Sequence, residues 1–266
     1  HGSVPYFTRK NLVKKIFDVL IGKSILKNAS ILVAETEVGV DEYIDLDRTI
    51  NRDEIVVLSP PFDTDEYIQL PKKGDFRKKY NILPSEKVVS FLGRVHYIKG
   101  NDFLIKGFAE FVKHDQHSRL VIIGPDDGHM TECKKIVIDL NIEDKVIFTG
   151  FLGGEYKNSA LVDSDIVVQL SRQEQGAWAP LEAVLCETPI VVTDHTGTGE
   201  DIKRMDAGYL VTFDDVIGLS NIFSTIFANY DLAMNKTLKA KQYIEQHLSF
   251  NYRVDEYTDI YNNSIK

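Results

Sequence analysis

Two basic side chains lie on a glycine-bounded segment that follows a short apolar run. Residues 88–92 predict a buried strand, and Gly93 directly after it allows a tight turn or a close approach of the backbone to a ligand. Arg94 and Lys99 follow on the same segment, before Gly100. Two cations at the end of a strand suit a diphosphate, because both groups bind phosphate oxygens through charge-assisted hydrogen bonds. The alternative is that they are ordinary surface cations.

Two carboxylates lie on a second segment, residues 169–182, which links another apolar run to a helix. Pro180 suits the first turn of that helix, so we predict that the helix begins there, with Glu174 on the loop and Glu182 in the first turn. A helix N-terminus binds anions, and carboxylates accept hydrogen bonds from sugar hydroxyls. Alternatively, Glu182 only stabilises the helix dipole.

A pair of carboxylates also suits the hydrolysis of a glycosidic bond. The neighbouring basic segment favours a phosphorylated ligand, so we favour sugar transfer over hydrolysis. A third segment, residues 193–200, again has glycines that permit close approach, and Glu200 caps or begins the helix after it.

Short apolar runs alternate with helical patterns from residue 87 onward. Strands are predicted at residues 88–92, 120–123, 146–148, 166–169, 190–192 and 209–211, and helices at residues 101–114, 131–140, 180–186, 219–229 and 232–247. This alternation predicts an α/β fold, a Rossmann-like parallel sheet with helices on both faces. Such sheets bind ligands beyond the carboxyl ends of their strands, which is where the three segments lie.

Composition excludes several classes of protein. The 266 residues include 31 Lys and Arg against 40 Asp and Glu, a net charge of −9, which argues against nucleic-acid binding. Two cysteines, Cys133 and Cys186, fit a reducing compartment and no disulfide framework. His114 and His117 are close in sequence, as are His129 and Cys133, but no further ligand types cluster with them, so we predict no metal site.

The N-terminal region has its own character. Residues 1–3, His-Gly-Ser, are typical of a cloning scar. Residues 9–27 carry six basic side chains against Asp18 alone, with apolar residues at helical spacing, which indicates a basic amphipathic helix. We expect its apolar face to pack on a core, and contact with an anionic membrane surface is the alternative. Short strands are expected at residues 31–34 and 55–58, before the break at Pro60 and Pro61.

In this order and spacing, the motifs resemble the group 1 (family 4) glycosyltransferases, retaining enzymes of the two-domain GT-B fold. The resemblance runs over residues 51–261. Its motifs are Gly93-Arg94 with Lys99-Gly100, Gly124-Pro125, residues 146–150, Glu174 with Glu182, residues 189–192 and residues 197–200. It implies three parts: residues 1–61, the scar and the end of the acceptor domain; residues 62–247, a domain that binds a nucleotide sugar; and residues 248–266, a closing helix that crosses back.

The resemblance also implies roles for particular residues. Arg94, Lys99 and Glu174 would be catalytic: the two cations would hold the donor diphosphate and Glu174 the donor sugar. Glu182 would bind the ribose. The remaining donor-binding residues would be Gly93, Gly150, Phe151, Ala177, Trp178, Ala179 and Leu181, with the N–H groups of residues 177–179 around the phosphates and residues 149–152 near the base. No cofactor or metal is expected, because basic groups replace the cation.

Trp178 departs from the small residue that is usual in the family, and would reshape the sugar pocket. The implied activity is transfer of a sugar from a nucleoside diphosphate sugar, such as a UDP- or GDP-sugar, to a glycan or lipid-linked acceptor. We expect most of the acceptor domain to lie outside this sequence, and the protein to work in polysaccharide or glycolipid assembly in the cytoplasm, at the inner face of the membrane. A sugar-nucleotide epimerase on the same fold and a non-catalytic binding module are the alternatives.

Overall fold

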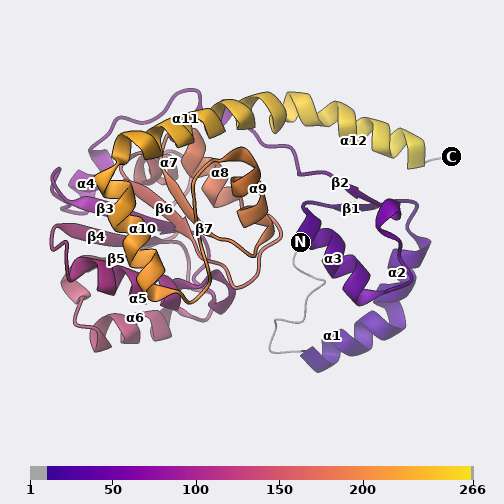
Figure 1. The fold of residues 1–266 in the computed structure, drawn as a ribbon, viewed down its shortest axis with the longest axis horizontal. Coiled ribbons are helices and arrows are strands. Elements are labelled where there is room, and N and C mark those ends of the chain that lie inside the picture. Colours follow the sequence, from indigo (N-terminus) through magenta and orange to yellow (C-terminus); the bar gives the residue numbers. More distant parts are fainter. Residues whose placement is uncertain (1–10, 265–266) are drawn as a thin grey trace.

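The protein folds into a small and a large lobe (Figure 1). The structure is a computed structural model and describes residues 11–264. The small lobe is built from the elements α1 to β2, and the large lobe from α4 to α11, while the last helix, α12 (Phe250–Ser264), extends from the large lobe over the small one. Within the described residues, no helix is long and apolar enough to cross a membrane.

Six parallel strands form the sheet of the large lobe, in the order β5-β4-β3-β6-β7-β8. They are β3 (Lys87–Leu92), β4 (Ser118–Ile123), β5 (Val146–Gly150), β6 (Ile166–Gln169), β7 (Ile190–Thr193) and β8 (Tyr209–Val211). Because all pairs are parallel, every strand ends at the same edge. The strand order reverses direction between β3 and β6, which is where such sheets open a crevice for ligands.

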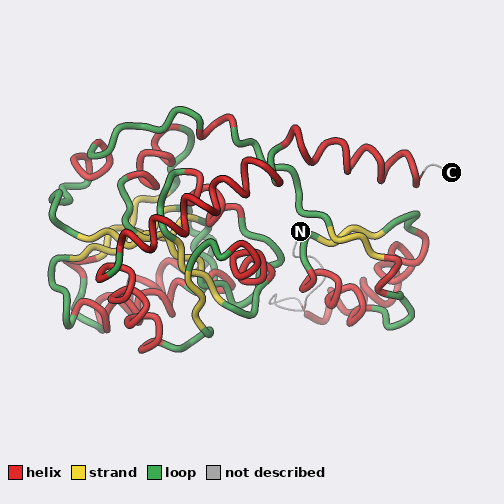
Figure 2. Tube along the Cα trace, turned by 45° about the horizontal axis from the view of Figure 1, so that its top comes forward, coloured by secondary structure: helices red, strands yellow, loops and turns green. Residues whose placement is uncertain are grey.

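Helices cover both faces of this sheet (Figure 2). In β4, Leu120 and Ile122 pack on one side, in the core with α5 (Asn101–Val112), α6 (Met130–Asp139) and α10 (Val216–Ala228). Val121 and Ile123 face the other side, which is covered by α4 (Asp75–Lys79), α7 (Glu155–Val162), α8 (Trp178–Leu185), α9 (Gly197–Met205) and α11 (Tyr230–His247). The predicted α/β fold with a doubly covered parallel sheet is confirmed.

The structure corrects one helix boundary that matters for function. Helix α8 begins at Trp178, two residues before Pro180, because its first turn accepts proline at any position that lacks an intrahelical donor. Glu182 is therefore in the second turn, where the helix dipole acts only weakly, so the dipole interpretation of Glu182 loses its basis. Helices α3 (Glu37–Leu46) and α7 were not predicted from the sequence.

The small lobe has a parallel pair of strands, β1 (Leu32–Ala34) and β2 (Ile55–Val57), with α3 packed on it. A helix precedes them, made of α1 (Asn11–Phe17), a π-helical turn over residues 18–22 and α2 (Lys23–Asn28).

This first helix does not bury its apolar face. Among its described side chains, Leu12, Ile16, Phe17, Leu20, Ile21 and Ile25 are 48–73% exposed, whereas Asp18 and Gly22 are buried. The predicted packing of the apolar face on a core is therefore wrong for these residues.

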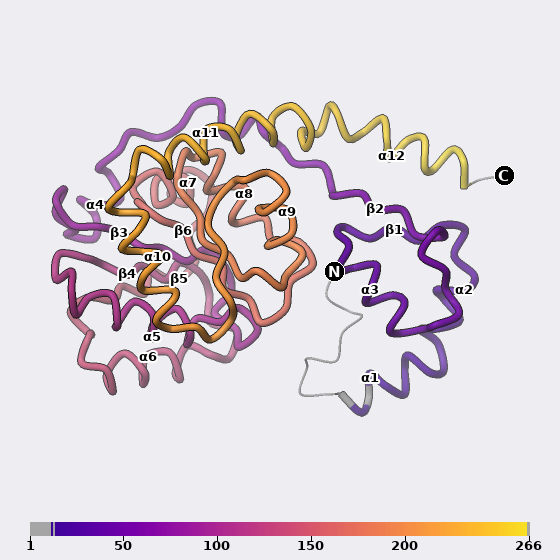
Figure 3. The backbone as a smooth tube through the Cα atoms, viewed as in Figure 1, coloured from indigo at the N-terminus to yellow at the C-terminus, as the bar shows by residue number. Residues whose placement is uncertain are grey.

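Two chain crossings join the lobes and lie together (Figure 3). Phe62 on the first crossing donates its N–H to the Leu248 carbonyl at 2.8 Å, and its carbonyl accepts from the Phe250 N–H at 2.9 Å. Farther along α12, the Tyr257 hydroxyl donates to the Leu58 carbonyl at 3.4 Å. The chain thus enters and leaves the large lobe through one hydrogen-bonded strip.

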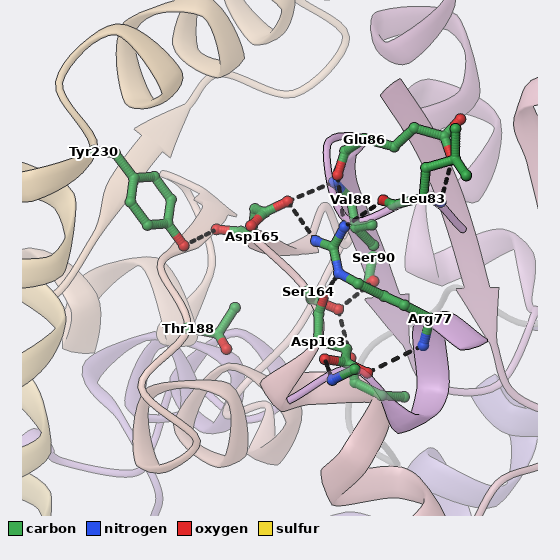
Figure 4. A network of polar contacts seen from close by, with 12 residues as sticks. Arg77, Leu83, Glu86, Val88, Ser90, Asp163, Ser164, Asp165, Thr188 and Tyr230 are labelled. Atoms are coloured by element: carbon green, nitrogen blue, oxygen red, sulfur yellow. Dashed lines mark hydrogen bonds and ion pairs between the residues drawn. The ribbon is translucent and has the colours of Figure 1, made fainter. Parts of the chain in front are cut away.

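At the opposite edge of the sheet, where its strands begin, a polar network anchors α4 (Figure 4). The Asp163 carboxylate accepts the backbone N–H groups of Gly74, Phe76 and Arg77 at 2.6–3.1 Å. Arg77 in turn pairs with Asp165 at 2.9 Å and donates to the carbonyls of Leu83 and Glu86. This network stabilises the end of the sheet where the strands begin. It does not involve the carboxyl edge, where the strands end.

Candidate active site

Three loops meet at the carboxyl edge of the sheet, because β3, β6 and β7 are neighbours in it. The loop after β3 contains the 3-10 helix η4 (Tyr97–Lys99). The loop after β6 donates the Arg172 N–H to the Ile98 carbonyl at 2.7 Å, and the Glu174 carbonyl accepts from the Gly197 N–H at 2.9 Å. The three segments that the sequence marked for chemistry are therefore in contact.

Lys99 and Glu174 form an ion pair at the centre of this edge. Lys99 Nζ contacts Glu174 Oε2, and their side chains are only 20% and 17% exposed. The Ser171 hydroxyl also lies 3.3 Å from the same carboxylate oxygen. The structure thus brings together two of the three residues proposed as catalytic, in a partly buried setting where charges interact more strongly than at a surface.

Arg94 lies on the same loop but pairs elsewhere. Its guanidinium contacts Asp127, on the loop after β4, and its side chain is 66% exposed. An exposed pair of this kind contributes about 1 kcal/mol or less, so Arg94 can leave Asp127 at little cost to bind an anion. Sequence reasoning missed Asp127, although its place two residues after the Gly124-Pro125 strand end was a usable signal.

Glycines bring the strand ends close together. A Cβ atom on Gly124, where φ is +146°, would lie 1.8 Å from the Gly93 carbonyl oxygen. The Gly124 N–H donates to the Gly150 carbonyl at 2.9 Å, which ties the ends of β4 and β5. Phe151 follows Gly150 with its ring 75% exposed, at the edge strand of the sheet.

Glu182 is held by a lysine and a tyrosine that sequence reasoning did not select. Lys157 on α7 donates from Nζ to Glu182 Oε1 at 2.7 Å and lies 3.1 Å from the Tyr67 hydroxyl. Burial and the Glu182 charge raise the pKa of Tyr67, so its hydroxyl stays protonated. The Glu182 side chain is 18% exposed, and a carboxylate can accept further hydrogen bonds beside that of Lys157.

The N-terminus of α8 differs from the expected phosphate cradle. The Ala177 N–H already donates to the Thr198 hydroxyl at 2.7 Å, so it is not open to a ligand in this structure. Trp178 turns toward the first crossing and packs on Phe62, with ring centroids 5.0 Å apart. The side chain of Trp178 is 44% exposed, and Ala179 follows it in the first turn.

The small lobe contributes to this region as well. The Thr36 hydroxyl donates to the Gln175 carbonyl at 3.0 Å, and Glu42 accepts from the side chains of Gln173 and Gln175. A cavity of about 30 Å³ lies beside them, enough for one water, and its lining includes Trp178, Leu181, Glu35 and Asp201. No local sequence signal pointed to these contacts, which join residues more than 130 positions apart.

Metal ligands do not gather at this edge. Among residues 11–264, no three His, Cys, Asp or Glu side chains converge to hold a metal ion.

Comparison with known proteins places this site in a family. The sequence profile of the glycosyl transferases group 1 matches residues 72–245. The chain therefore belongs to the group 1 glycosyl transferases. That match contains all three loops of the carboxyl edge, together with Glu182.

Individual relatives agree. The D-inositol 3-phosphate glycosyltransferase of Gordonia bronchialis is 25% identical over 252 residues, which are 92% of this chain and 54% of that protein. An uncharacterized glycosyltransferase of Methanocaldococcus jannaschii is 31% identical over 145 residues, 54% of this chain and 36% of that protein. The chain thus spans about half or less of the length of these relatives.

Solved structures share the fold. The Anabaena protein Alr3699/HepE, solved in complex with UDP and glucose, superposes with a TM-score of 0.82 at 19% identity, over 97% of this chain and 68% of that one. The sucrose-phosphate synthase of Thermosynechococcus elongatus gives 0.80 at 20% identity, over 98% and 65%. The architecture is that of GT-B glycosyltransferases.

Proposed function

We propose that this chain forms the donor-binding part of a glycosyltransferase that moves a sugar, with retention, from a nucleoside diphosphate sugar to a glycan or lipid-linked acceptor. The observation that carries the proposal is the Lys99–Glu174 pair at the switch point of the sheet, inside the region that defines the family. That Alr3699/HepE was solved with UDP-glucose supports a nucleotide sugar as donor.

In this proposal the cations and the carboxylates of the carboxyl edge bind different parts of the donor. Lys99 and Arg94 bind the diphosphate and stabilise the negative charge that grows on it as the sugar leaves, without a metal ion. Glu174 and Glu182 accept hydrogen bonds from hydroxyls of the donor, Glu174 at the sugar and Glu182 at the ribose. The acceptor would bind opposite this edge, on the side of the small lobe.

A binding screen tests this proposal. We expect one of UDP, GDP, ADP and dTDP to raise the melting temperature, because a ligand that binds only the folded state stabilises it. Lys99→Met should make that shift much smaller, because the diphosphate then keeps only Arg94 as a cation. Lys113→Met is the matched control, because Lys113, directly after α5, makes an exposed ion pair with Glu110 away from the loops. Absence of a shift with every nucleotide, or an equal shift with Lys99→Met, would refute the proposed donor site.

A further inference from the structure

Arg172 lies two residues before Glu174, at the point where the loops after β3 and β6 touch. Its guanidinium makes two parallel hydrogen bonds with Asp102, the second residue of α5, at 2.9 and 2.6 Å. The side chains of Arg172 and Asp102 are 13% and 14% exposed. Two planar groups paired in this way fix both distance and orientation, which one lysine could not do.

The same guanidinium holds the short helix that carries Lys99. It donates to the Tyr97 carbonyl, and its central carbon lies 3.8 Å from the centroid of the Tyr97 ring. The Arg172 backbone N–H donates to the Ile98 carbonyl at 2.7 Å. Tyr97, Ile98 and Lys99 are consecutive residues of η4. Arg172 therefore fixes the backbone of η4, the short helix that carries Lys99.

Further contacts close the cluster from the other sides. Phe213, after β8, has its ring centroid 4.8 Å from the guanidinium, and His195, after β7, has Nε2 2.9 Å from the Arg172 carbonyl. Burial raises the pKa of Asp102, but the hydrogen bonds and charge of Arg172 outweigh it and hold that pKa below its usual range. The pair is therefore charged at neutral pH.

We propose that Arg172, locked by Asp102, is a positioning residue that sets Lys99 against Glu174 so that the two can receive a nucleotide sugar together. This inference rests on the proposed function. It names a residue that acts through the loop backbone, since its guanidinium contacts Asp102, the Tyr97 carbonyl and the rings of Tyr97 and Phe213. Such a residue raises donor affinity by pre-organising the site.

The large lobe offers a matched control for this role. Arg77 and Asp165 form another partly buried pair, at 2.9 Å with side chains 13% and 22% exposed, but at the opposite edge of the sheet (Figure 4). Breaking either pair leaves a charge without its partner and should lower stability. Only the Arg172 pair contacts η4, the short helix that carries Lys99, so only its loss should change donor affinity.

The test is calorimetric titration with the nucleoside diphosphate found in the screen. We expect Arg172→Met to weaken binding about tenfold, a typical coupling between contacting groups, and Arg77→Met to leave the affinity unchanged although it lowers the melting temperature. Arg172→Lys should not restore the affinity, because an ammonium lacks the planar fork. If Arg172→Met does not fold, Asp102→Asn carries the same expectation.

A double-mutant cycle separates positioning from a general structural role. Once Lys99→Met has removed the group being positioned, Arg172→Met should weaken binding no further. Additive losses, equal effects of Arg172→Met and Arg77→Met, or full affinity in Arg172→Met would overturn the inference while the proposed function stands. Failure of the unmodified chain to bind any of the nucleotides would instead overturn the proposed function, and this inference with it.

Discussion

At the scale of single residues, the charged side chains of the candidate site neutralise one another in ion pairs. The cation proposed for the diphosphate and the carboxylate proposed for the sugar are bonded to each other. Likewise Glu182 is bonded to Lys157, and Arg94 to Asp127. A donor that binds here must therefore replace protein carboxylates with its own phosphates and hydroxyls. On the proposed function, we therefore expect Glu174 to compete with a bare nucleoside diphosphate and to lower its affinity.

Removing the Glu174 carboxylate should raise, and not lower, the affinity for the nucleoside diphosphate. Glu174→Gln should tighten binding of the nucleoside diphosphate several-fold, which is about 1 kcal/mol of binding free energy. The reason is that Lys99 no longer has to give up an ion pair before it binds the phosphate. The same change should reduce any preference for the sugar-bearing donor. Calorimetry with the nucleotide and its sugar conjugate measures both. Glu110→Gln on α5 is the control, and weaker nucleotide binding by Glu174→Gln would contradict the competition.

A second residue-scale prediction concerns Asp201 on α9, beside the cavity between the lobes. Burial raises the pKa of Asp201 to about 6, opposed by Arg204 and Arg253 and reinforced by Glu200 and Glu35. The folded state then binds a proton more tightly than the unfolded state, whose Asp has a pKa of about 3.9. Ionised Asp201 therefore costs stability above pH 6, and that cost disappears as the pH falls to about 4.

Asp201→Asn should accordingly raise the melting temperature at pH 7.5, and the gain should vanish near pH 4. The difference between the two proteins isolates this group, since other carboxyl groups titrate in both. Asp206→Asn, in the turn after the same helix, is an exposed control that should show no such gain. A constant difference at every pH would contradict the prediction.

At the scale of elements, the sheet edge depends on backbone contacts that only glycine allows. Gly124→Ala should cost several kcal/mol, about 3 to 4, or prevent folding, because its Cβ would overlap the Gly93 carbonyl. Gly128→Ala is the matched control: its φ is also positive, +87°, but nothing lies within 4 Å of the added carbon. It should cost only about 1 kcal/mol. Urea unfolding compares them, and equal losses would show that strain alone matters.

Elements were predictable from the sequence where apolar periodicity was strong. All six predicted strands of the large sheet overlap real ones, since buried parallel strands are continuous apolar runs. Helix α7 was not predicted, because it buries the polar residues Asn158 and Ser159 and has little apolar periodicity. The three segments that meet at the carboxyl edge were singled out because glycines, cations and carboxylates cluster at strand ends. Lys157, Asp102 and Arg172 received no role because their partners come from distant segments.

At the scale of the whole molecule, the two lobes are joined at the site itself. Glu42 and Thr36 of the small lobe bind the loop that carries Glu174, and Phe62 of the first crossing packs on Trp178. A change in the lobe arrangement would therefore move the residues of the candidate site. Sequence alone could not give these contacts, because they depend on how two separately formed lobes meet.

The first helix provides the last prediction, because its apolar side chains face outward in a strongly basic segment. Apolar side chains flanked by lysines favour the surface of an anionic bilayer, where both the hydrophobic effect and charge attract the helix. We therefore expect the protein to float with vesicles that contain anionic lipid, and 0.5 M salt to weaken this binding.

Leu20→Glu, at a residue that is 71% exposed, should abolish flotation. Ile217→Glu is the matched control, since that side chain is 56% exposed on α10 of the large lobe and should leave flotation unchanged. Absence of flotation at low salt, or equal loss in both variants, would mean that this helix is not a membrane contact and that its apolar face serves another surface.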